Sequence, residues 1–171
     1  MIHDTAIIIP SRIGSTRLPA KPLKIIGNKT MVEHVVDRAL ESNSGRVYVA
    51  TDSNEIASIV AATDATPVMV TEEVETGTDR VWAAFCKIPN KEEIKYIVNL
   101  QGDLPLVNPA VIVSVVESLR SSGADIVTPI TKELSQDTND SSKVKVAKTP
   151  NNQALYFSRN SIPHGAEWHW H

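Results

Sequence analysis

The first segment that could do chemistry is a loop at residues 10–22, which reads PSRIGSTRLPAKP. It carries three cations, Arg12, Arg17 and Lys21, among glycine and hydroxyl residues. Arginine offers forked donors and lysine a compact charge, while small residues let the backbone approach a ligand closely. This composition suits a polyphosphate, with a solvated basic loop as the alternative. Neither GxxxxGK[ST] nor GxGxxG is present, so the two common phosphate-binding fingerprints are excluded.

A second segment, NLQGDLP at residues 99–105, places a single carboxylate, Asp103, directly after a glycine. Glycine allows a tight turn, so the carboxylate can lie just beyond the end of a strand. Magnesium takes only one or two protein carboxylates and completes its shell with water and phosphate oxygens. Asp103 is therefore a candidate ligand for Mg²⁺ on a bound triphosphate. The alternative is an ordinary turn aspartate.

A third segment, ETGTDR at residues 75–80, opens a predicted helix. The backbone donors of a first helical turn, together with Arg80, could bind an anion or the edge of a base. A plain helix start with Thr78 as its cap explains the same residues equally well. Asp52, after a predicted strand, is interpreted as a helix cap rather than a ligand, with Ser53 as the other candidate for that cap.

The elements that must position these loops follow from hydrophobic periodicity. Strands are expected at residues 5–10, 46–51, 67–70, 96–100 and 125–129, and helices around residues 32–40, 56–60, 81–88 and 109–119. Thr30 and Glu33 form a capping-box pattern at the first helix, and Gly45 lies just past its end. Strands at residues 144–147 and 154–157 are expected to form a late antiparallel hairpin.

This alternation of strands and helices predicts an α/β fold with a doubly wound, mostly parallel sheet, in the Rossmann-like manner. Ligands of such sheets bind at the carboxyl ends of the strands. The three segments above all follow predicted strands, so the pattern directs attention to that edge.

Composition narrows the class of protein further. The 171 residues contain 17 Lys+Arg and 20 Asp+Glu, for a formal net charge of −3, with 42% hydrophobic residues. This length and composition predict a single folded domain over residues 1–171. The mild acidity argues against a nucleic-acid partner, and the lack of an apolar run of about 18 residues argues against a membrane span. Without a recognisable signal peptide, we expect a cytoplasmic protein that acts on a small molecule.

Taken together, PSRIGSTRLPAKPL, TGTDR and VNLQGDLP, followed by VKVAKTPNNQALYFSRNSIP, resemble the CMP-KDO synthetase family, the 3-deoxy-manno-octulosonate cytidylyltransferases. The resemblance runs in order along essentially the whole chain. It implies an α/β nucleotidyltransferase that couples CTP with the acid sugar KDO and releases pyrophosphate. The product, CMP-KDO, would serve lipopolysaccharide biosynthesis, and the complete protein would be a homodimer.

The resemblance also implies roles for particular residues. Arg12, Lys21 and Asp103 are expected to be catalytic, with Arg12 and Lys21 gripping the triphosphate and Asp103 holding Mg²⁺. Substrate contacts are expected from Ser15 and Arg17 beside the triphosphate, from Arg80 and Gln101 on the cytosine and substrate sides, and from Arg159 on the sugar side.

Two departures from the family pattern limit these expectations. Leu104 stands where the family usually has glutamate, which removes one carboxylate near the site. The family also continues beyond this chain, with a C-terminal dimerisation and sugar-site portion that includes a second metal-binding aspartate. We therefore expect this chain to bind CTP with Mg²⁺, and turnover to require the C-terminal portion. The alternatives are a cytidylyltransferase for a related acid sugar such as 8-amino-KDO, or a nucleotide-binding module without turnover.

Overall fold

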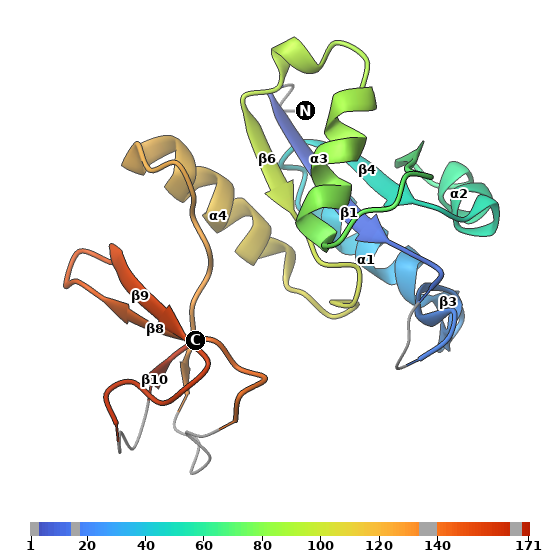
Figure 1. Cartoon of the computed structure of the whole chain (residues 1–171). Helices are drawn as coiled ribbons and strands as arrows, with labels where there is room; N and C mark the ends of the chain where they lie inside the picture. The colour runs from blue at the N-terminus through green and yellow to red at the C-terminus, as the bar shows by residue number, and fades with distance from the viewer. Residues whose placement is uncertain (1–3, 15–17, 134–139, 165–168) are drawn as a thin grey trace. The chain divides into compact units, whose positions relative to one another are not determined.

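The computed structural model describes residues 4–14, 18–133, 140–164 and 169–171 (Figure 1). Contacts between residues divide the chain into two compact units, Met1–Val127 and Thr128–His171. The expectation of a single domain over residues 1–171 stays a prediction.

The first unit is built on a parallel sheet. Its four strands are β1 (Thr5–Ser11), β4 (Arg46–Thr51), β5 (Thr66–Met69) and β6 (Tyr96–Asn99). They lie in the order β5-β4-β1-β6, and every neighbouring pair is parallel. The predicted α/β class with a parallel sheet is confirmed. Because β1 is central, the loop that follows it lies in the middle of the carboxyl edge.

Helices cover both faces of this sheet. They are α1 (Met31–Glu41), α2 (Asn54–Ala61), α3 (Gly77–Lys87) and α4 (Pro109–Ser122), with a short 3₁₀ helix, η2 (Lys91–Glu93), before β6. Alternate residues of β1 point to opposite faces. Ile7 and Ile9 pack with buried residues of α1, α2 and α4, whereas Ala6 and Ile8 pack with α3. This burial on both sides explains the run of isoleucines in β1. Within the described residues, no helix is long and apolar enough to span a bilayer.

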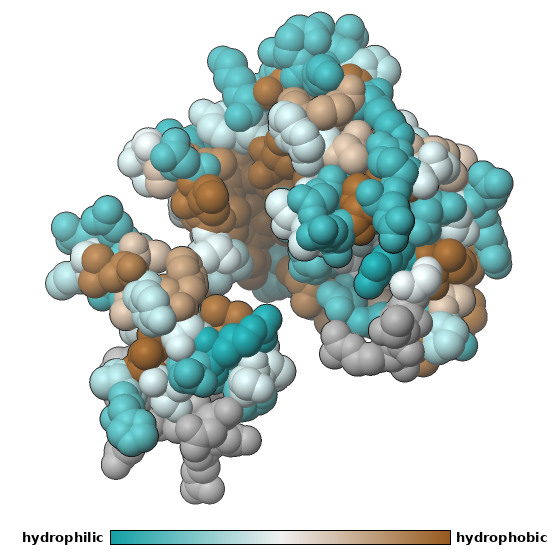
Figure 2. Space-filling view, viewed as in Figure 1, coloured by the Kyte–Doolittle hydropathy of each residue, from teal (hydrophilic) through white to brown (hydrophobic). Residues whose placement is uncertain are grey.

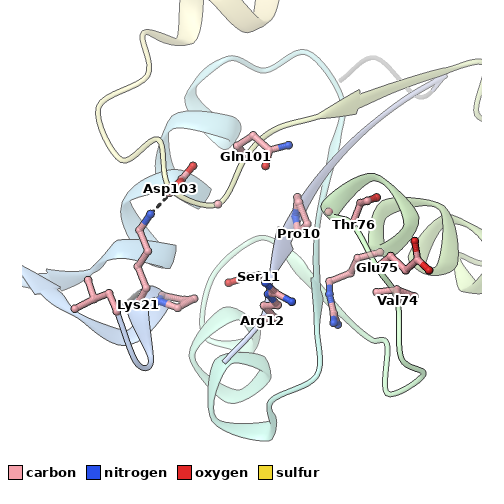
Figure 3. A pocket seen from close by; sticks show the side chains of 14 residues that line it. Pro10, Ser11, Arg12, Lys21, Val74, Glu75, Thr76, Gln101 and Asp103 are labelled. Carbon is pink, nitrogen blue, oxygen red and sulfur yellow. Dashed lines mark hydrogen bonds and ion pairs between the residues drawn. The ribbon is translucent and has the colours of Figure 1, made fainter. Parts of the chain in front are cut away.

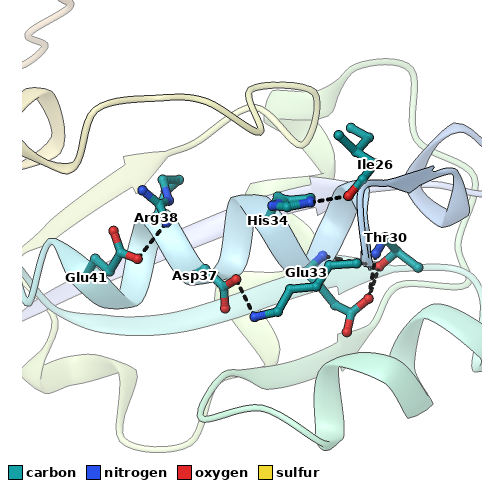
Figure 4. Close-up of polar contacts among 8 residues, drawn as sticks. Ile26, Thr30, Glu33, His34, Asp37, Arg38 and Glu41 are labelled. Carbon is teal, nitrogen blue, oxygen red and sulfur yellow. Dashed lines mark hydrogen bonds and ion pairs between the residues drawn. The ribbon is translucent and has the colours of Figure 1, made fainter.

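The start of α1 is fixed by the predicted capping box (Figure 4). The Thr30 hydroxyl accepts from the Glu33 N–H at 3.4 Å, and the Glu33 carboxylate accepts from the Thr30 N–H at 2.7 Å. A two-stranded hairpin, β2 (Ile25–Ile26) and β3 (Lys29–Thr30), precedes the helix. The ring of His34 donates to the Ile26 carbonyl at 2.8 Å and so ties this hairpin to the helix.

Gly45 does not have the expected role at the end of α1. The helix ends at Glu41, and Asn43 is the residue that adopts a left-handed conformation, with φ of 50°. A Cβ atom at Gly45 would lie 2.4 Å from the carbonyl oxygen of Thr5. The glycine therefore permits the close approach of β4 to β1 and is not needed as a helix terminator.

The second unit is a small antiparallel sheet. Its strands are β7 (Lys132–Glu133), β8 (Lys145–Lys148), β9 (Ala154–Ser158) and β10 (His169–Trp170), in the order β7-β10-β8-β9. The antiparallel pairing of β8 and β9 confirms the predicted late hairpin. Apolar side chains of β9, including Leu155 and Phe157, are exposed. Figure 2 shows hydrophobic residues, in brown, at the surface of each unit.

The strand predicted at residues 125–129 is wrong. These residues form no strand, and Ile126 is 85% exposed. The boundary between the two units falls inside this segment. Its apolar composition therefore belongs to a connection and not to the sheet.

Candidate functional site

A pocket lies at the carboxyl edge of the parallel sheet (Figure 3). Its volume is about 590 Å³, and it is lined by the end of β1, the segment around Lys21, the start of α3 and the turn after β6. Three cations, Arg12, Lys21 and Arg80, share the lining with two carboxylates, Glu75 and Asp103. A cleft of this size with an excess of cations suits a compact anion, and it lies where parallel sheets bind their ligands.

Lys21 and Asp103 form an ion pair across this pocket, as Figure 3 shows. The Lys21 Nζ donates to the Asp103 carboxylate at 2.8 Å, although the residues are 82 positions apart. Their side chains are 34% and 53% exposed. An ion pair this open to solvent adds little to stability. A charged ligand can therefore replace either partner at a small cost in free energy.

Two backbone features bring this pair together. A Cβ atom at Gly102 would lie 2.6 Å from the Pro10 carbonyl oxygen, so only glycine lets the turn after β6 pass this close to β1. On the other side, Lys21 begins the short 3₁₀ helix η1 (Lys21–Leu23), and Ala20 before it has a φ of 50°. A left-handed alanine costs about 1 kcal/mol. The loop thus holds a strained conformation at the residue that delivers Lys21 to the pocket.

Arg80 is held differently. It lies in the first turn of α3, and its side chain is only 8% exposed. One Nη atom donates to the Val70 carbonyl at 3.0 Å, and the other lies 3.4 Å from the Asp52 carboxylate. This carboxylate also accepts from the backbone N–H of Ile13 at 3.0 Å. The guanidinium is therefore neutralised and fixed at the wall of the pocket.

Arg12 is exposed and forms no ion pair with any residue that the structure describes. It follows Ser11, the last residue of β1, which also lines the pocket. Ser11 is 3% exposed, and its hydroxyl has no hydrogen-bond partner among the described residues. The end of β1 thus presents a guanidinium without an ion-pair partner among the described residues, beside a buried hydroxyl that also lacks a partner among them.

The start of α3 is capped by Thr76, so the alternative interpretation in which Thr78 caps this helix is wrong. The Thr76 hydroxyl accepts from the Asp79 N–H at 3.1 Å, and the Asp79 carboxylate accepts from the Thr76 N–H at 3.0 Å. This reciprocal box begins the helix two residues earlier than expected. Thr78 instead accepts from the side chain of Asn99 at 3.3 Å, which links α3 to β6.

The structure gathers most of the predicted site residues in this one pocket. Those lining it are Arg12, Lys21, Arg80, Gln101 and Asp103.

Ser15 and Arg17, the two predicted contacts beside the triphosphate, lie outside the described residues. Arg159 lies in the second unit, at the end of β9, where its guanidinium donates to the Ser141 carbonyl at 2.8 Å.

Sequence reasoning missed two residues of the site. Asp52 is not the cap of α2, because Ser53 fills that position and its hydroxyl accepts from the Ile56 N–H at 3.4 Å. Its long-range pairing had no signal in the sequence. Ser11, in contrast, was detectable, since it directly follows the strand predicted at residues 5–10, at the carboxyl end where parallel sheets bind their ligands.

Comparison with known proteins gives consistent matches. The cytidylyltransferase family model matches residues 6–169. A 3-deoxy-manno-octulosonate cytidylyltransferase of Rickettsia bellii is 46% identical over 165 residues, which is 96% of this chain and 68% of that protein. The enzyme of the same name from Rickettsia felis is 47% identical over 96% of this chain and 67% of its own length. The chain therefore spans about two thirds of these relatives.

A solved structure agrees with these matches. The structure of CMP:2-keto-3-deoxy-manno-octonic acid synthetase complexed with CTP superposes with a TM-score of 0.85 and 32% identity. It covers 97% of this chain, and this chain covers 70% of it. A nucleotidyl transferase from Methanothermobacter shares the fold, with a TM-score of 0.58 at 17% identity.

Proposed function

This chain belongs to the 3-deoxy-manno-octulosonate cytidylyltransferase family, and we propose that it couples CTP with KDO to form CMP-KDO and pyrophosphate. One observation carries the proposal for this chain. The Lys21–Asp103 pair lies in a pocket with three cations at the carboxyl edge of the parallel sheet. The fold around it matches a relative complexed with CTP over 97% of this chain. The product would supply KDO to lipopolysaccharide biosynthesis.

In the proposed reaction, the C2 hydroxyl oxygen of KDO attacks the α-phosphorus of CTP. A new O–P bond forms as the bond between the α-phosphorus and the bridging oxygen breaks, pyrophosphate leaves, and the hydroxyl proton passes to solvent. The contribution of the protein is positioning and neutralisation of charge, as in phosphoryl transfer generally. No protein nucleophile takes part.

Arg12 and Lys21 are proposed to do this work on the triphosphate. The exposed guanidinium of Arg12 can donate two parallel hydrogen bonds to phosphate oxygens. When the nucleotide enters, Lys21 leaves Asp103 and binds a phosphate oxygen. Its positive charge then stabilises the negative charge on the departing pyrophosphate. The buried hydroxyl of Ser11 gains the hydrogen-bond partner that it lacks among the described residues.

Asp103 is proposed to hold Mg²⁺. Its side chain is 53% exposed at the pocket, and carboxylate oxygens are the hard ligands that magnesium prefers. Within the described residues, no group of three or more His, Cys, Asp or Glu side chains could form a protein cage. A site with one protein carboxylate and several phosphate and water oxygens fits this donor set. Magnesium bound there would neutralise charge on the triphosphate.

Gln101 in the first unit is proposed as a substrate contact, and Arg159 in the second unit is proposed separately, on the resemblance, as a contact on the sugar side. The Gln101 amide donates to the Asn99 side chain at 3.0 Å, which leaves its carbonyl oxygen free to accept from a sugar hydroxyl. Arg159 offers a guanidinium whose partner in the described structure is a neutral carbonyl, so its charge is available to a carboxylate. Ser15 and Arg17 are proposed as further triphosphate contacts on the resemblance of their loop. A cytoplasmic homodimer is likewise proposed on the resemblance.

Pyrophosphate release with CTP and KDO tests the proposal, with ATP, sialic acid and 8-amino-KDO as competing substrates. In a form extended to the length of its relatives, with the C-terminal portion that turnover is expected to require, the expected result is release that needs CTP, KDO and Mg²⁺ together, with CMP-KDO as the second product. Faster release with 8-amino-KDO would reassign the sugar. CTP binding without release under any of these conditions would favour a nucleotide-binding module.

A further inference from the structure

Asp52, the residue that directly follows β4, makes two contacts that helix capping does not explain. Ser53 caps α2, so the Asp52 carboxylate is not needed there. Both of its oxygens reach residues far away in the sequence. One accepts from Ile13, 39 positions earlier, and the other faces Arg80, 28 positions later. Both of these partners belong to the walls of the pocket or adjoin them.

The first contact fixes the loop that carries Arg12. The N–H of Ile13 belongs to the peptide bond that follows Arg12, so its hydrogen bond to Asp52 orients that peptide plane. Arg12 is exposed and has no ion pair within the described residues, so its own side chain does little to hold the loop. The direction in which the chain leaves β1 therefore depends on this bond, since a hydrogen bond to a charged acceptor is stronger than a neutral one.

The second contact fixes Arg80. A guanidinium that is 92% buried by side-chain area needs a counter-charge, because burial of an unpaired charge is costly. Asp52 supplies that charge at 3.4 Å, and the Val70 carbonyl occupies the other Nη atom at 3.0 Å. Asp52 is itself absent from the residues that line the described pocket. It acts through its two neighbours.

We propose that Asp52 is a positioning residue of the nucleotide site. One oxygen holds the Arg12–Ile13 peptide and the other holds the Arg80 guanidinium, so a single carboxylate sets the spacing between two cationic walls of the pocket. The inference rests on the proposed function in that CTP is taken as the ligand. The new element is that Asp52, which does not line the pocket, positions two residues that do, Arg12 and Arg80.

Two substitutions separate the contact of Asp52 with Ile13 from its contact with Arg80. Asp52→Ala removes both contacts. Asp52→Asn keeps an oxygen that can accept from Ile13 but loses the charge that faces Arg80, so it is the milder change and retains the shape of the side chain. Ser53→Ala is the matched control for α2, because it removes the cap and leaves the carboxylate. Asp64→Asn, at an exposed turn, controls for loss of one negative charge.

The first measurement is amide hydrogen exchange of Ile13 in the protein without nucleotide. We expect Asp52→Ala to accelerate this exchange by about tenfold, as the loss of a hydrogen bond to a charged group implies. Asp52→Asn should change it little, and Ser53→Ala and Asp64→Asn should not change it. Equal exchange at Ile13 in wild type and Asp52→Ala would overturn the proposal.

The second measurement is the dissociation constant of CTP in the presence of Mg²⁺, with the melting temperature recorded alongside. Asp52→Ala should bind CTP about tenfold more weakly, and Asp52→Asn, which loses only the charge that faces Arg80, should weaken binding by a smaller factor. The two controls should bind as wild type does even if Ser53→Ala lowers the melting temperature. A lower melting temperature with unchanged CTP affinity in both Asp52 variants would reduce Asp52 to a purely structural role and overturn the proposal. If wild type binds no CTP while Ile13 exchange still responds to Asp52→Ala, the proposed function fails and the positioning of the loop stands.

Discussion

Two cations of the pocket in the first unit and two cations of the second unit have different kinds of partner. In the first unit, Lys21 pairs with Asp103 and Arg80 with Asp52, each across a long stretch of sequence. In the second unit, the fully buried Lys145 donates to the carbonyl oxygens of Asp140 and Arg159. Arg159 in turn donates to the Ser141 carbonyl at 2.8 Å. Among the described residues, neither of these two cations contacts a carboxylate.

The difference separates a binding arrangement from a structural one. In the pocket, the exposed Asp103 carboxylate neutralises Lys21 until an anionic ligand takes its place, which suits a site that must release its product. The Asp52 carboxylate instead stays with the buried Arg80 and fixes it. A backbone carbonyl leaves the charge of the cation intact and fixes the chain around it. Lys145 thereby joins the loop at Asp140 to the end of β9, and the Arg159 guanidinium binds the Ser141 carbonyl of the same loop. The following predictions test this contrast.

The largest effect is expected at Lys21. In an active form extended by the C-terminal portion, Lys21→Ala should lower kcat/KM for CTP by about 10²–10³, by analogy with the removal of one preorganised charge stabiliser. The measurement is steady-state pyrophosphate release with CTP varied. Lys24→Ala removes a nearby exposed lysine and should leave the rate unchanged. Similar losses in both variants would mean that general charge, and not the pocket pair, drives binding.

The next effect is expected at Lys145 and concerns stability. Lys145→Ala leaves two carbonyl oxygens without their donor and should lower the free energy of unfolding of the second unit by about 3 kcal/mol. Hydrogen exchange of the β8 and β9 amides measures this loss. Lys148→Ala, on the same strand, removes a hydrogen bond to Asn152 and a contact with the ring of Trp170, and should cost about 1 kcal/mol or less. Protection unchanged by Lys145→Ala would show that the buried ammonium does not hold this unit together.

A smaller effect is expected at the cap of α3 and only in the first unit. Thr76→Ala removes the capping hydroxyl and should cost about 1 kcal/mol of stability, measured by urea unfolding. Hydrogen exchange should rise at the start of α3 and stay constant in β8. Thr78→Ala is the control, since its hydroxyl lies outside the capping box. A larger loss of stability from Thr78→Ala than from Thr76→Ala would show that Thr78, and not Thr76, caps α3.

The smallest effect is a pH dependence at α1. The hydrogen bonds from the Thr30 hydroxyl, and next from its backbone N–H, lower the pKa of Glu33 below its ordinary value. Stability from this carboxylate is therefore present above the pKa of an unfolded glutamate and is lost as pH falls through the lower folded value. Glu33→Gln should remove that part of the acid dependence of the melting temperature. Identical acid profiles for the two proteins would contradict it.

Much of the scaffold was predictable because it depends on local patterns. A run of isoleucines buried on both faces identifies β1, and the glycine before Asp103 identifies a tight turn beyond β6. The segment around Ile126 was not predictable, because an apolar run shows strand propensity and not whether a partner strand lies within reach. The cap at Thr76 was missed because its box uses aspartate in place of the usual glutamate or glutamine.

The candidate site was predictable to a similar degree. The pocket cations were found because loops at the carboxyl ends of parallel strands must converge. Their partners were not, since the pairing of Lys21 with Asp103 and of Arg80 with Asp52 depends on tertiary distances that no spacing encodes.

Equilibrium titration with CTP tests the central claim most directly. The claim is that the pocket of the first unit binds the triphosphate through Lys21 and its neighbours. We predict that wild-type protein binds CTP with Mg²⁺ and prefers it to ATP, that Lys21→Ala weakens this binding, and that Lys24→Ala leaves it unchanged. No CTP binding by the wild type, or equal binding by wild type and Lys21→Ala, would contradict the account.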